Sequence, residues 1–230
     1  MDSVQILKTD ISVTNIDEVS RILIREKEVL IAICNANTLV QCYKNVKLNK
    51  LINSFTIKCP DGFPVAKSSR LLYKNNQKRV DGYKLFLKTL EFGLSNNTSH
   101  YFYGNNEFVT KKMIKEIKKL YPSVNIAGYF CPPVLNYDQL TQKEYLSDLI
   151  VRKPDIVWVS LGFPKQEQFI NLFNKNYNIK SNMVGVGAVF EWMAGTKYKA
   201  PEWLANIGFE WIFRLFQEPK RLLRRYLVDN

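Results

Sequence analysis

Short apolar runs alternate with longer amphipathic segments along this chain of 230 residues. The apolar runs are rich in β-branched and aromatic residues and predict strands at 29–34, 55–59, 100–104, 124–130, 156–161 and 183–187. Between them, apolar residues recur every three to four positions, which predicts helices at 16–28, 38–47, 63–73, 83–94, 107–121, 138–151 and 164–174. Strands that alternate with helices at this spacing predict an α/β fold in which helices flank a mainly parallel sheet.

One stretch, 154–170, joins a buried strand to a helix through a glycine turn. Gly162 permits a sharp turn, and Pro164 suits the first turn of a helix because its missing N–H would have no partner there. In an open α/β fold, this arrangement places backbone N–H groups at the carboxyl edge of the sheet. It therefore predicts an anion-binding turn with the polar residues 165–167 at its rim.

The end of the chain has a different character. From Pro201 to Asn230 the pattern is helical, and Pro219 starts a new helix or kinks the one before it. Beyond Pro219, arginines and leucines fall on opposite sides of a short helix that aromatic residues precede. Such a helix can lie on a membrane surface, or it can pack its leucines on the core. We therefore expect a Rossmann-like core at 1–196 and a basic helical appendage at 197–230.

The balance of charges indicates an anionic partner. The chain carries 33 Lys and Arg against 21 Asp and Glu, a net charge of +12, which suits nucleic acid, an acidic membrane or phosphorylated substrates.

Four cysteines without a C-x-x-C pair and a single histidine, His100, disfavour a zinc site and predict reduced, mostly buried thiols, as in a cytosolic protein. We find no signal region and no segment that approaches the ~20 apolar residues of a membrane span, so a soluble or peripheral protein is expected.

Several residues follow predicted strands and would meet at the carboxyl edge of the sheet. Asp61 can cap the helix that follows it, or it can act as a general base that takes a proton from a hydroxyl nucleophile. Asn35 can bind a sugar hydroxyl or close a turn, and Arg79 can contact a phosphate or stay solvated. Gly185 and Gly187 allow close approach to the backbone, although a lone G-x-G is weak evidence. No D-x-D motif occurs, so a metal-bridged nucleotide diphosphate is unsupported, and Arg, Lys and backbone N–H groups would meet the leaving-group charge.

A series of motifs in chain order resembles one family of enzymes. The motifs are Pro60-Asp61-Gly62, Gly162-Phe163-Pro164-Lys165-Gln166-Glu167, Gly185-Val186-Gly187, Phe190-Glu191-Trp192-Met193-Ala194-Gly195, Ala200-Pro201, and a tail with Glu210-Trp211, Arg214-Leu215, Glu218-Pro219, Arg221 and Arg224-Arg225-Tyr226. Together they resemble the WecG/TagA/CpsF family of bacterial glycosyltransferases, glycosyltransferase family 26, over roughly 4–227. The Pro-Lys-Gln-Glu block and the arginine-rich tail are specific when they occur together.

The resemblance implies an inverting transfer from a UDP-sugar to a polyprenyl-diphosphate-linked saccharide, without a cofactor or a metal. Such reactions build teichoic acid linkage units, enterobacterial common antigen, capsule, O-antigen or exopolysaccharide at the cytoplasmic face of the bacterial plasma membrane. The resemblance further implies that Asp61 is the catalytic base, and that the tail associates with the anionic membrane and closes over the site. The substrate-binding residues that we expect are Asn35, Arg79, Gln166, Gly162, Gly185, Gly187, Arg214, Arg221 and Arg224.

Two positions depart from the family pattern. Ile33 replaces the Thr of its T-x-N motif, and Lys84 replaces the Asp of its G-x-D-L motif. Both lie where the sugars should be recognised, so the resemblance implies the reaction class but not the sugar. N-acetylmannosamine, glucose and uronic acid donors all occur in the family, and Cys131-Pro132-Pro133 matches a variant common among exopolysaccharide members, which favours a capsule or O-antigen pathway. The acceptor sugar, the linkage and any homo-oligomer stay open.

Two other functions fit parts of the sequence. The lysine-rich helix at 111–119 and the arginine tail could bind nucleic acid, but no recognised nucleic-acid motif is present, and Trp and Phe interleave the tail as at a membrane interface. The departures at Ile33 and Lys84 could mark an inactive relative that only scaffolds a synthesis complex. The retained Asp61, Arg79 and Gln166 argue against that alternative.

Overall fold

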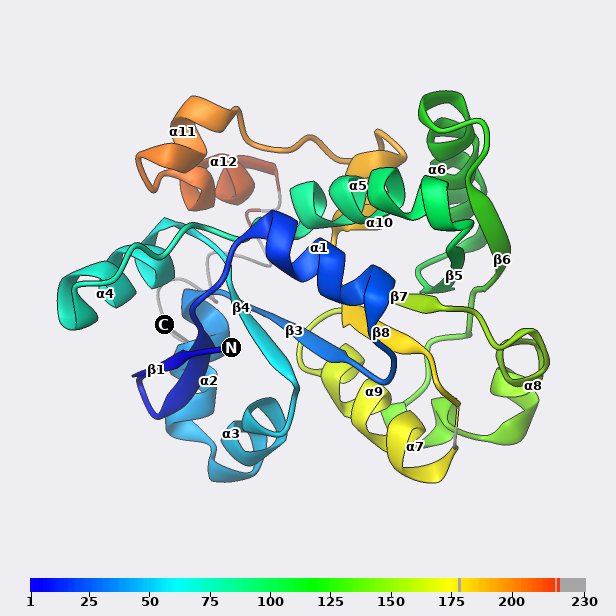
Figure 1. Ribbon diagram of the computed structural model, residues 1–230, viewed down its shortest axis with the longest axis horizontal. Coiled ribbons are helices and arrows are strands. Elements are labelled where there is room, and N and C mark those ends of the chain that lie inside the picture. The colour runs from blue at the N-terminus through cyan, green and yellow to red at the C-terminus, as the bar shows by residue number, and fades with distance from the viewer. Residues whose placement is uncertain (178, 218, 220–230) are drawn as a thin grey trace.

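A six-stranded parallel sheet lies at the centre of the computed structural model, which describes residues 1–177, 179–217 and 219 (Figure 1). Its strands are β3 (Leu30–Cys34), β4 (Ile57–Pro60), β5 (Ser99–Gly104), β6 (Asn125–Phe130), β7 (Ile156–Ser160) and β8 (Asn182–Gly185). Their spatial order is β4-β3-β8-β7-β5-β6, and each neighbouring pair is parallel. The predicted Rossmann-like α/β class is therefore confirmed, with all six predicted strands.

Helices cover both faces of this sheet (Figure 1). One face carries α1 (Ile16–Arg25), α5 (Gly82–Gly93), α6 (Glu107–Leu120) and α10 (Val189–Met193). The other carries α2 (Ala36–Lys44), α3 (Val46–Asn53), α7 (Tyr137–Leu140), α8 (Lys143–Arg152) and α9 (Lys165–Asn176). Strand residues alternate between the two layers, so that Ile31 packs into the first and its neighbours Leu30 and Ala32 into the second. Burial on both sides explains why the strands read as continuous apolar runs.

The structure differs from the predicted elements near the N-terminus. Strands β1 (Ser3–Ile6) and β2 (Thr9–Ser12) form an antiparallel hairpin that the sequence did not indicate. β2 lies beside β4, where the Ser12 hydroxyl accepts a hydrogen bond from the backbone N–H of Lys58. The helix predicted at 38–47 ends at Lys44, because Asn45 terminates α2 and its side chain caps α3.

Three helices lie together at one end of the molecule, at the left of Figure 1: α4 (Phe63–Tyr73), α11 (Glu202–Asn206) and α12 (Glu210–Gln217). α4 has its predicted bounds, and the helical pattern after β8 is confirmed as far as α12. The predicted basic helix beyond Pro219 lies outside the described residues, so the appendage at 197–230 and its membrane role stay predictions. Within the described ranges, we find no helix that is long and apolar enough to cross a membrane.

The single histidine belongs to the core. His100 lies at the amino end of β5, is fully buried and accepts a hydrogen bond at Nδ1 from Trp158 Nε1 at 3.2 Å. Burial lowers its pKa to about 4, so His100 is neutral at pH 7 and sits at the edge of the sheet opposite the predicted site. All four cysteine thiols are free and three are buried, as expected.

Candidate active site

A cleft of about 160 Å³ opens at the carboxyl edge of the sheet, the edge where open parallel sheets bind ligands. It is lined by Ile33, Asn35, Thr38, Asp61, Asp81, Gly82, Gly162, Phe163, Gln166, Gly185, Val186, Gly187, Ala188, Trp192, Lys197, Tyr198, Glu210 and Gln217. Six residues that the sequence singled out therefore meet in one place, namely Asn35, Asp61, Gly162, Gln166, Gly185 and Gly187. A seventh, Arg79, contacts Asp61 from the loop between α4 and α5.

Asp61 follows β4 directly and lines this cleft. Its backbone N–H donates to the carbonyl of Cys34 at 2.9 Å, which continues the pairing of β4 with β3 by one residue. Its Oδ1 accepts a hydrogen bond from the N–H of Gly62 at 2.8 Å. Gly62, with a φ of +81°, takes the N-cap position of α4 without a side-chain cap. The helix-capping alternative for Asp61 is therefore wrong, and its carboxylate stays at the cleft.

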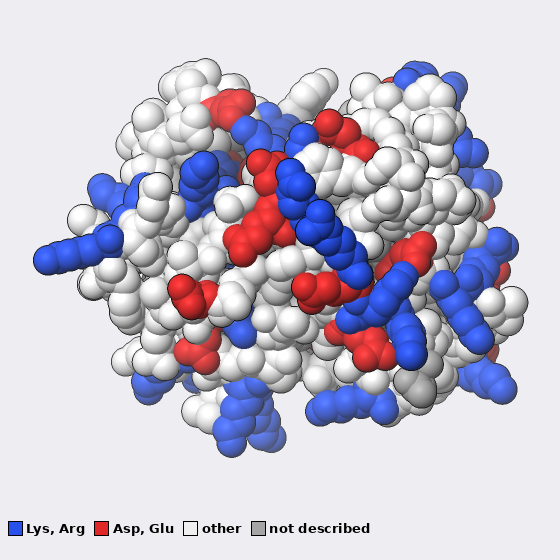
Figure 2. All heavy atoms as spheres, in the orientation of Figure 1, with Lys and Arg blue, Asp and Glu red and all other residues white. Residues whose placement is uncertain are grey.

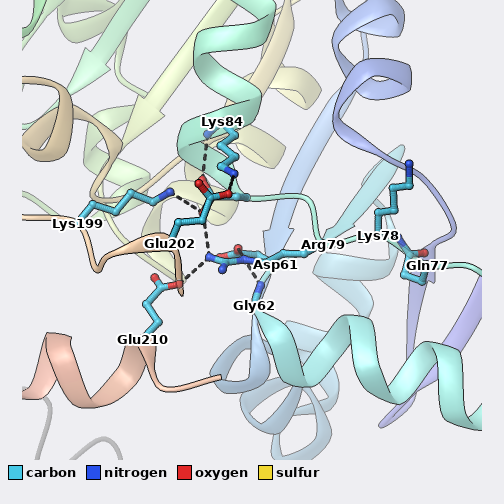
Figure 3. Close-up of polar contacts among 10 residues, drawn as sticks. Asp61, Gly62, Gln77, Lys78, Arg79, Lys84, Lys199, Glu202 and Glu210 are labelled. Carbon is cyan, nitrogen blue, oxygen red and sulfur yellow. Dashed lines mark hydrogen bonds and ion pairs between the residues drawn. The ribbon is translucent and has the colours of Figure 1, made fainter. Parts of the chain in front are cut away.

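Arg79 lies among three carboxylates (Figure 3). Its Nη2 donates to Asp81 Oδ2 at 2.8 Å and to Glu210 Oε2 at 2.6 Å, and its Nε lies 3.6 Å from Asp61 Oδ1. Burial opposes the guanidinium charge, but the three carboxylates outweigh burial and raise the pKa of Arg79. Among the described residues, no three His, Cys, Asp or Glu side chains form a group suited to a metal ion, and the cation between these carboxylates is Arg79 itself. An anionic ligand would bind Arg79 in competition with Glu210.

Asp81 lines the cleft but was not among the predicted site residues. Its Oδ1 accepts a hydrogen bond from the N–H of Lys84 at 2.9 Å, which caps α5, and Lys199 Nζ lies 2.8 Å from its Oδ2. Burial acts to raise the pKa of Asp81, but Lys199 and the capping hydrogen bond outweigh burial and lower it. The sequence did hold a signal, because an Asp just before a helical pattern is a typical cap.

Asn35 caps α2 and lines the cleft at the same time. Its Oδ1 accepts a hydrogen bond from the N–H of Thr38 at 3.2 Å, so the turn-closing role is confirmed. The cap holds the amide at the cleft wall. Ile33 lies on the same wall and packs on Gly82, where an added Cβ would lie 3.7 Å from Ile33 Cγ2. The departure at Ile33 thus places an apolar wall where the family pattern has a hydroxyl.

Gln166 is held in one orientation. Its Oε1 accepts a hydrogen bond from the N–H of Gly187 at 3.1 Å, and its Nε2 donates to Glu167 Oε1 at 2.9 Å. Gly185 makes room for this amide, because a Cβ at Gly185 would lie 2.8 Å from Gln166 Nε2. Gly187 has a φ of +57°, which favours glycine, and its carbonyl accepts a hydrogen bond from Ser160 Oγ at 2.7 Å. The turn after β8 is therefore fixed from both sides.

Glu167 lies in the core and not at the rim of the cleft, which corrects the prediction. It is fully buried near Cys34 and Cys42, and its Oε2 has no hydrogen-bond partner. Burial raises its pKa to about 7, and the hydrogen bonds from Gln166 and from its own backbone N–H offset this only in part. The polar residues 165–167 were misleading because neighbouring residues in the first turn of α9 face different sides. Gln166 faces the cleft, and Glu167 faces the core.

The start of α9 differs from the predicted anion-binding turn. The helix begins at Lys165, and Pro164 takes the N-cap position before it. The N–H of Gln166 donates to the carbonyl of Gly162 at 2.9 Å, and the N–H of Glu167 meets its own carboxylate. This turn therefore offers the cleft the Gln166 side chain and the Gly162 backbone, and fewer open N–H groups than predicted.

Three further residues after β8 complete the cleft, Trp192, Tyr198 and Gln217, and sequence reasoning gave these three no role. Trp192 and Tyr198 add aromatic walls, which together with a few polar groups are typical of ligand sites. The Gln217 amide of α12 bonds both backbone groups of Tyr198, at 3.2 and 2.9 Å, and so ties α12 to the cleft. Arg214 belongs to α12, but its side chain lies outside what the structure describes, as do Arg221 and Arg224 entirely. Their contacts stay predictions.

Comparison with known proteins identifies the family. The family model "Glycosyl transferase WecG/TagA/CpsF family" matches residues 4–230 of this chain. The chain belongs to this family. The match thus covers almost the whole sequence, including all the motifs that suggested the resemblance.

Individual relatives of this WecG/TagA/CpsF chain share one name, N-acetylglucosaminyldiphosphoundecaprenol N-acetyl-beta-D-mannosaminyltransferase. The protein of Bacillus spizizenii strain W23 is 29% identical over 206 residues, which cover 90% of this chain and 78% of the relative. The protein of Bacillus subtilis strain 168 is 29% identical over 181 residues, or 78% of this chain and 68% of the relative. The protein of Staphylococcus aureus strain MW2 is 29% identical over 175 residues, or 76% and 66%.

In this member of the WecG/TagA/CpsF family, Lys84 has a charged partner on the C-terminal segment. Its Nζ contacts the Glu202 carboxylate of α11 (Figure 3). Two further pairs connect the same two regions, Asp81–Lys199 and Arg79–Glu210. Three ion pairs therefore join the segment after β8 to the start of α5 and the loop before it, and the departure at Lys84 takes part in this connection.

Proposed function

We propose that this protein is an inverting, metal-independent glycosyltransferase that moves a sugar from a UDP-sugar to a polyprenyl-diphosphate-linked saccharide. The observation that carries the proposal is Asp61, a carboxylate at the carboxyl edge of the sheet in a cleft lined by the family's motif residues. The relatives' names support a lipid-linked acceptor and favour N-acetylmannosamine over other N-acetylhexosamines, hexoses and uronic acids as the sugar that we propose. The product would enter capsule, O-antigen, exopolysaccharide or teichoic acid synthesis.

Asp61 takes the proton of the acceptor hydroxyl while the hydroxyl oxygen attacks the anomeric carbon of the donor. The attack comes from the face opposite UDP, so the new bond forms as the bond from the anomeric carbon to the diphosphate oxygen breaks. UDP leaves with that electron pair. The hydrogen bond from Gly62 and the nearby Arg79 guanidinium orient the Asp61 carboxylate for this step.

The donor side of the site is formed by Asn35, Gln166 and the glycine turns. The fixed Gln166 amide and the β8 turn present polar groups whose directions are set before the donor binds, which limits the entropy lost on binding. Gly185 and Gly187 leave the backbone open to close approach. Arg79 stabilises the charge on the departing UDP after its ion pair with Glu210 breaks. The tail arginines Arg214, Arg221 and Arg224 stabilise the same charge.

The acceptor reaches the cleft from the side of the C-terminal segment, where Tyr198 and Gln217 form its border. A lipid-linked acceptor is held in a bilayer, so the protein works as a peripheral enzyme at the cytoplasmic face of the plasma membrane. The basic tail suits both the anionic leaflet and the acceptor diphosphate.

The experiment that tests this proposal measures UDP release from a panel of UDP-sugars, with and without a short-chain polyprenyl-diphospho-N-acetylglucosamine. We expect release that depends on the acceptor, with one preferred donor, and an unchanged rate in EDTA. Donor binding without release on any acceptor of this class would contradict the transferase, and loss of release in EDTA that returns with added Mg²⁺ would contradict metal independence.

A further inference from the structure

α4 ends in exposed leucines within a purely basic stretch of chain. Between Asp61 and Asp81 the sequence has five cations and no acidic residue; the cations are Lys67, Arg70, Lys74, Lys78 and Arg79. Only Val65, Ala66 and Ser69 of α4 are buried, whereas the exposed fractions of Leu71 and Leu72 are 69% and 66%. Basic side chains project over α4 at the left edge of Figure 2. This helix therefore covers little of the core and presents apolar and positive groups to solvent.

α11 and α12 lie at the same end of the molecule (Figure 1). Other exposed apolar side chains lie on and beside these two helices. They are Trp203, Ile207, Phe209, Trp211 and Phe216. Gly208, in the turn between α11 and α12, packs on Phe63 at the start of α4, since a Cβ there would lie 2.9 Å from the Phe63 ring. The start of α4 and the turn between α11 and α12 thus lie in contact with one another.

Exposed apolar residues also occur elsewhere on the molecule, and Tyr43 and Val46 lie in another stretch without acidic residues, 29–60. Leu120 ends α6 and Val151 lies near the end of α8, at the opposite end of the molecule. Single exposed residues of this kind are ordinary on protein surfaces. The lysines of α6 are interspersed with glutamates that pair with them, as Lys111 does with Glu107. The α4 end differs in that its exposed leucines and cations adjoin the exposed apolar residues of α11 and α12.

We propose that α4 forms, together with α11 and α12, a docking face for the surface of an anionic bilayer, with Leu71 and Leu72 inserted between headgroups and Lys67 and Lys74 over anionic lipids. Exposed apolar side chains flanked by cations fit such a surface by both shape and charge. A second copy of the chain fits it poorly, because a two-fold interface would set the cations of one copy against those of the other. The inference rests on the proposed function only in that a lipid-linked acceptor brings the enzyme to a bilayer.

The test measures how the full-length protein sediments with vesicles of phosphatidylglycerol and phosphatidylethanolamine, and with neutral phosphatidylcholine vesicles, in the absence of any sugar substrate. The variants are Leu71→Gln/Leu72→Gln and Lys67→Gln/Lys74→Gln. The matched controls at the other end of the molecule are Leu120→Gln/Val151→Gln and Lys112→Gln/Lys115→Gln. Hydrogen exchange of the amides of 67–74 with and without vesicles reports contact directly, with those of α8 as the internal reference.

We expect the leucine variant to partition into anionic vesicles at least ~10-fold less than wild type, and the lysine variant about 5-fold less for each neutralised charge. The control variants partition like wild type, neutral vesicles bind weakly, and vesicles protect the amides of 67–74. All variants keep wild-type turnover on a water-soluble acceptor if the transferase proposal is right.

Unchanged partition of both α4 variants together with unprotected 67–74 amides would overturn the docking face. So would a leucine variant that changes only the oligomeric state in sedimentation velocity, or a lysine variant that loses affinity for nucleic acid while wild type ignores vesicles. Because vesicle binding is measured without substrates, α4-dependent partition without UDP release would refute the proposed reaction and leave the docking face standing.

Discussion

Gln166 and Glu167 are neighbours in the sequence that serve opposite sides of the sheet edge. Gln166 lines the cleft, and Glu167 lies in the core beneath it and accepts one of its amide hydrogens. A buried carboxyl group with an unpartnered oxygen destabilises the folded protein once it is ionised. The presence of Glu167 next to the site therefore calls for a structural or functional explanation. The hydrogen bond to Gln166 supplies one, because it fixes the amide that holds the β8 turn at Gly187.

The pH dependence of stability tests this environment of Glu167. Its pKa of about 7, against 4.5 normally, means that between these pH values the folded protein keeps a proton that the unfolded chain has lost. The stability that Glu167 contributes is therefore complete below pH 4.5 and falls by roughly 3 kcal/mol as the pH rises to about 7. His100, with its pKa lowered to about 4, acts in the opposite direction over a similar range.

We expect Glu167→Gln to remove the first of these two contributions. In urea unfolding at pH 5 and pH 8, the variant should gain stability relative to wild type at the higher pH, by up to about 3 kcal/mol. A difference between the two proteins that stays the same at both pH values would show that Glu167 titrates normally.

At the scale of elements, the C-terminal helices are attached to the core by charge pairs at the site itself. Lys84–Glu202 is exposed and contributes little stability, whereas Arg79–Glu210 is largely shielded from water and occupies the guanidinium that we propose for the diphosphate. Glu210 therefore both positions α12 and offsets the charge of Arg79.

Glu210→Gln should strengthen UDP binding. Removing the competing carboxylate frees Arg79 for the diphosphate, and we expect the Kd for UDP to fall about fivefold, equivalent to about 1 kcal/mol, in isothermal titration calorimetry. Glu202→Gln is the matched control, because it breaks an ion pair of the same segment without touching Arg79. Weaker UDP binding in Glu210→Gln alone would mean that Glu210 supports the site and does not compete with the ligand.

The sequence predicted helices and strands well where the hydrophobic pattern repeats over many residues. It predicted them poorly where a single side chain determines where an element ends. All six sheet strands and α4 follow from apolar runs and caps, and so does the meeting of Asn35, Asp61 and Gln166 at one edge. The break between α2 and α3 depends on the single Asn45 side chain, and the β1–β2 hairpin is too short for a period. The ion pair of Arg79 with Glu210 could not be predicted, because these two residues lie 131 positions apart in the chain.

At the scale of the whole molecule, the cleft is narrower than its proposed ligand requires. Its volume of about 160 Å³ lies below the ~300 Å³ at which small-molecule sites begin. The segment from Lys197 to Gln217 forms one border, so its movement is the simplest way to admit a nucleotide sugar. Docking of α4, α11 and α12 on a bilayer would couple that movement to the arrival of the lipid-linked acceptor.

Truncation after Gln217 tests the contribution of the basic tail. The removed residues include Lys220, Arg221, Arg224 and Arg225, and each cation near an anionic leaflet contributes about 1 kcal/mol, so we expect vesicle partition to fall by at least ~10-fold. Turnover on a vesicle-borne acceptor should fall with it. A truncated protein that still sediments with anionic vesicles and turns over normally would refute a role for the tail.

The measurement that tests the central claim most directly is the single-turnover rate of Asp61→Asn with saturating donor and acceptor. Asn keeps the shape and can accept the hydrogen bond from Gly62, but it cannot take a proton at neutral pH. We predict a rate lower by ~10²–10⁴-fold with donor affinity within about threefold of wild type, while the surface control Asp17→Asn stays unchanged. An Asp61→Asn rate close to that of wild type would contradict Asp61 as the base and, with it, the reaction assigned to this cleft.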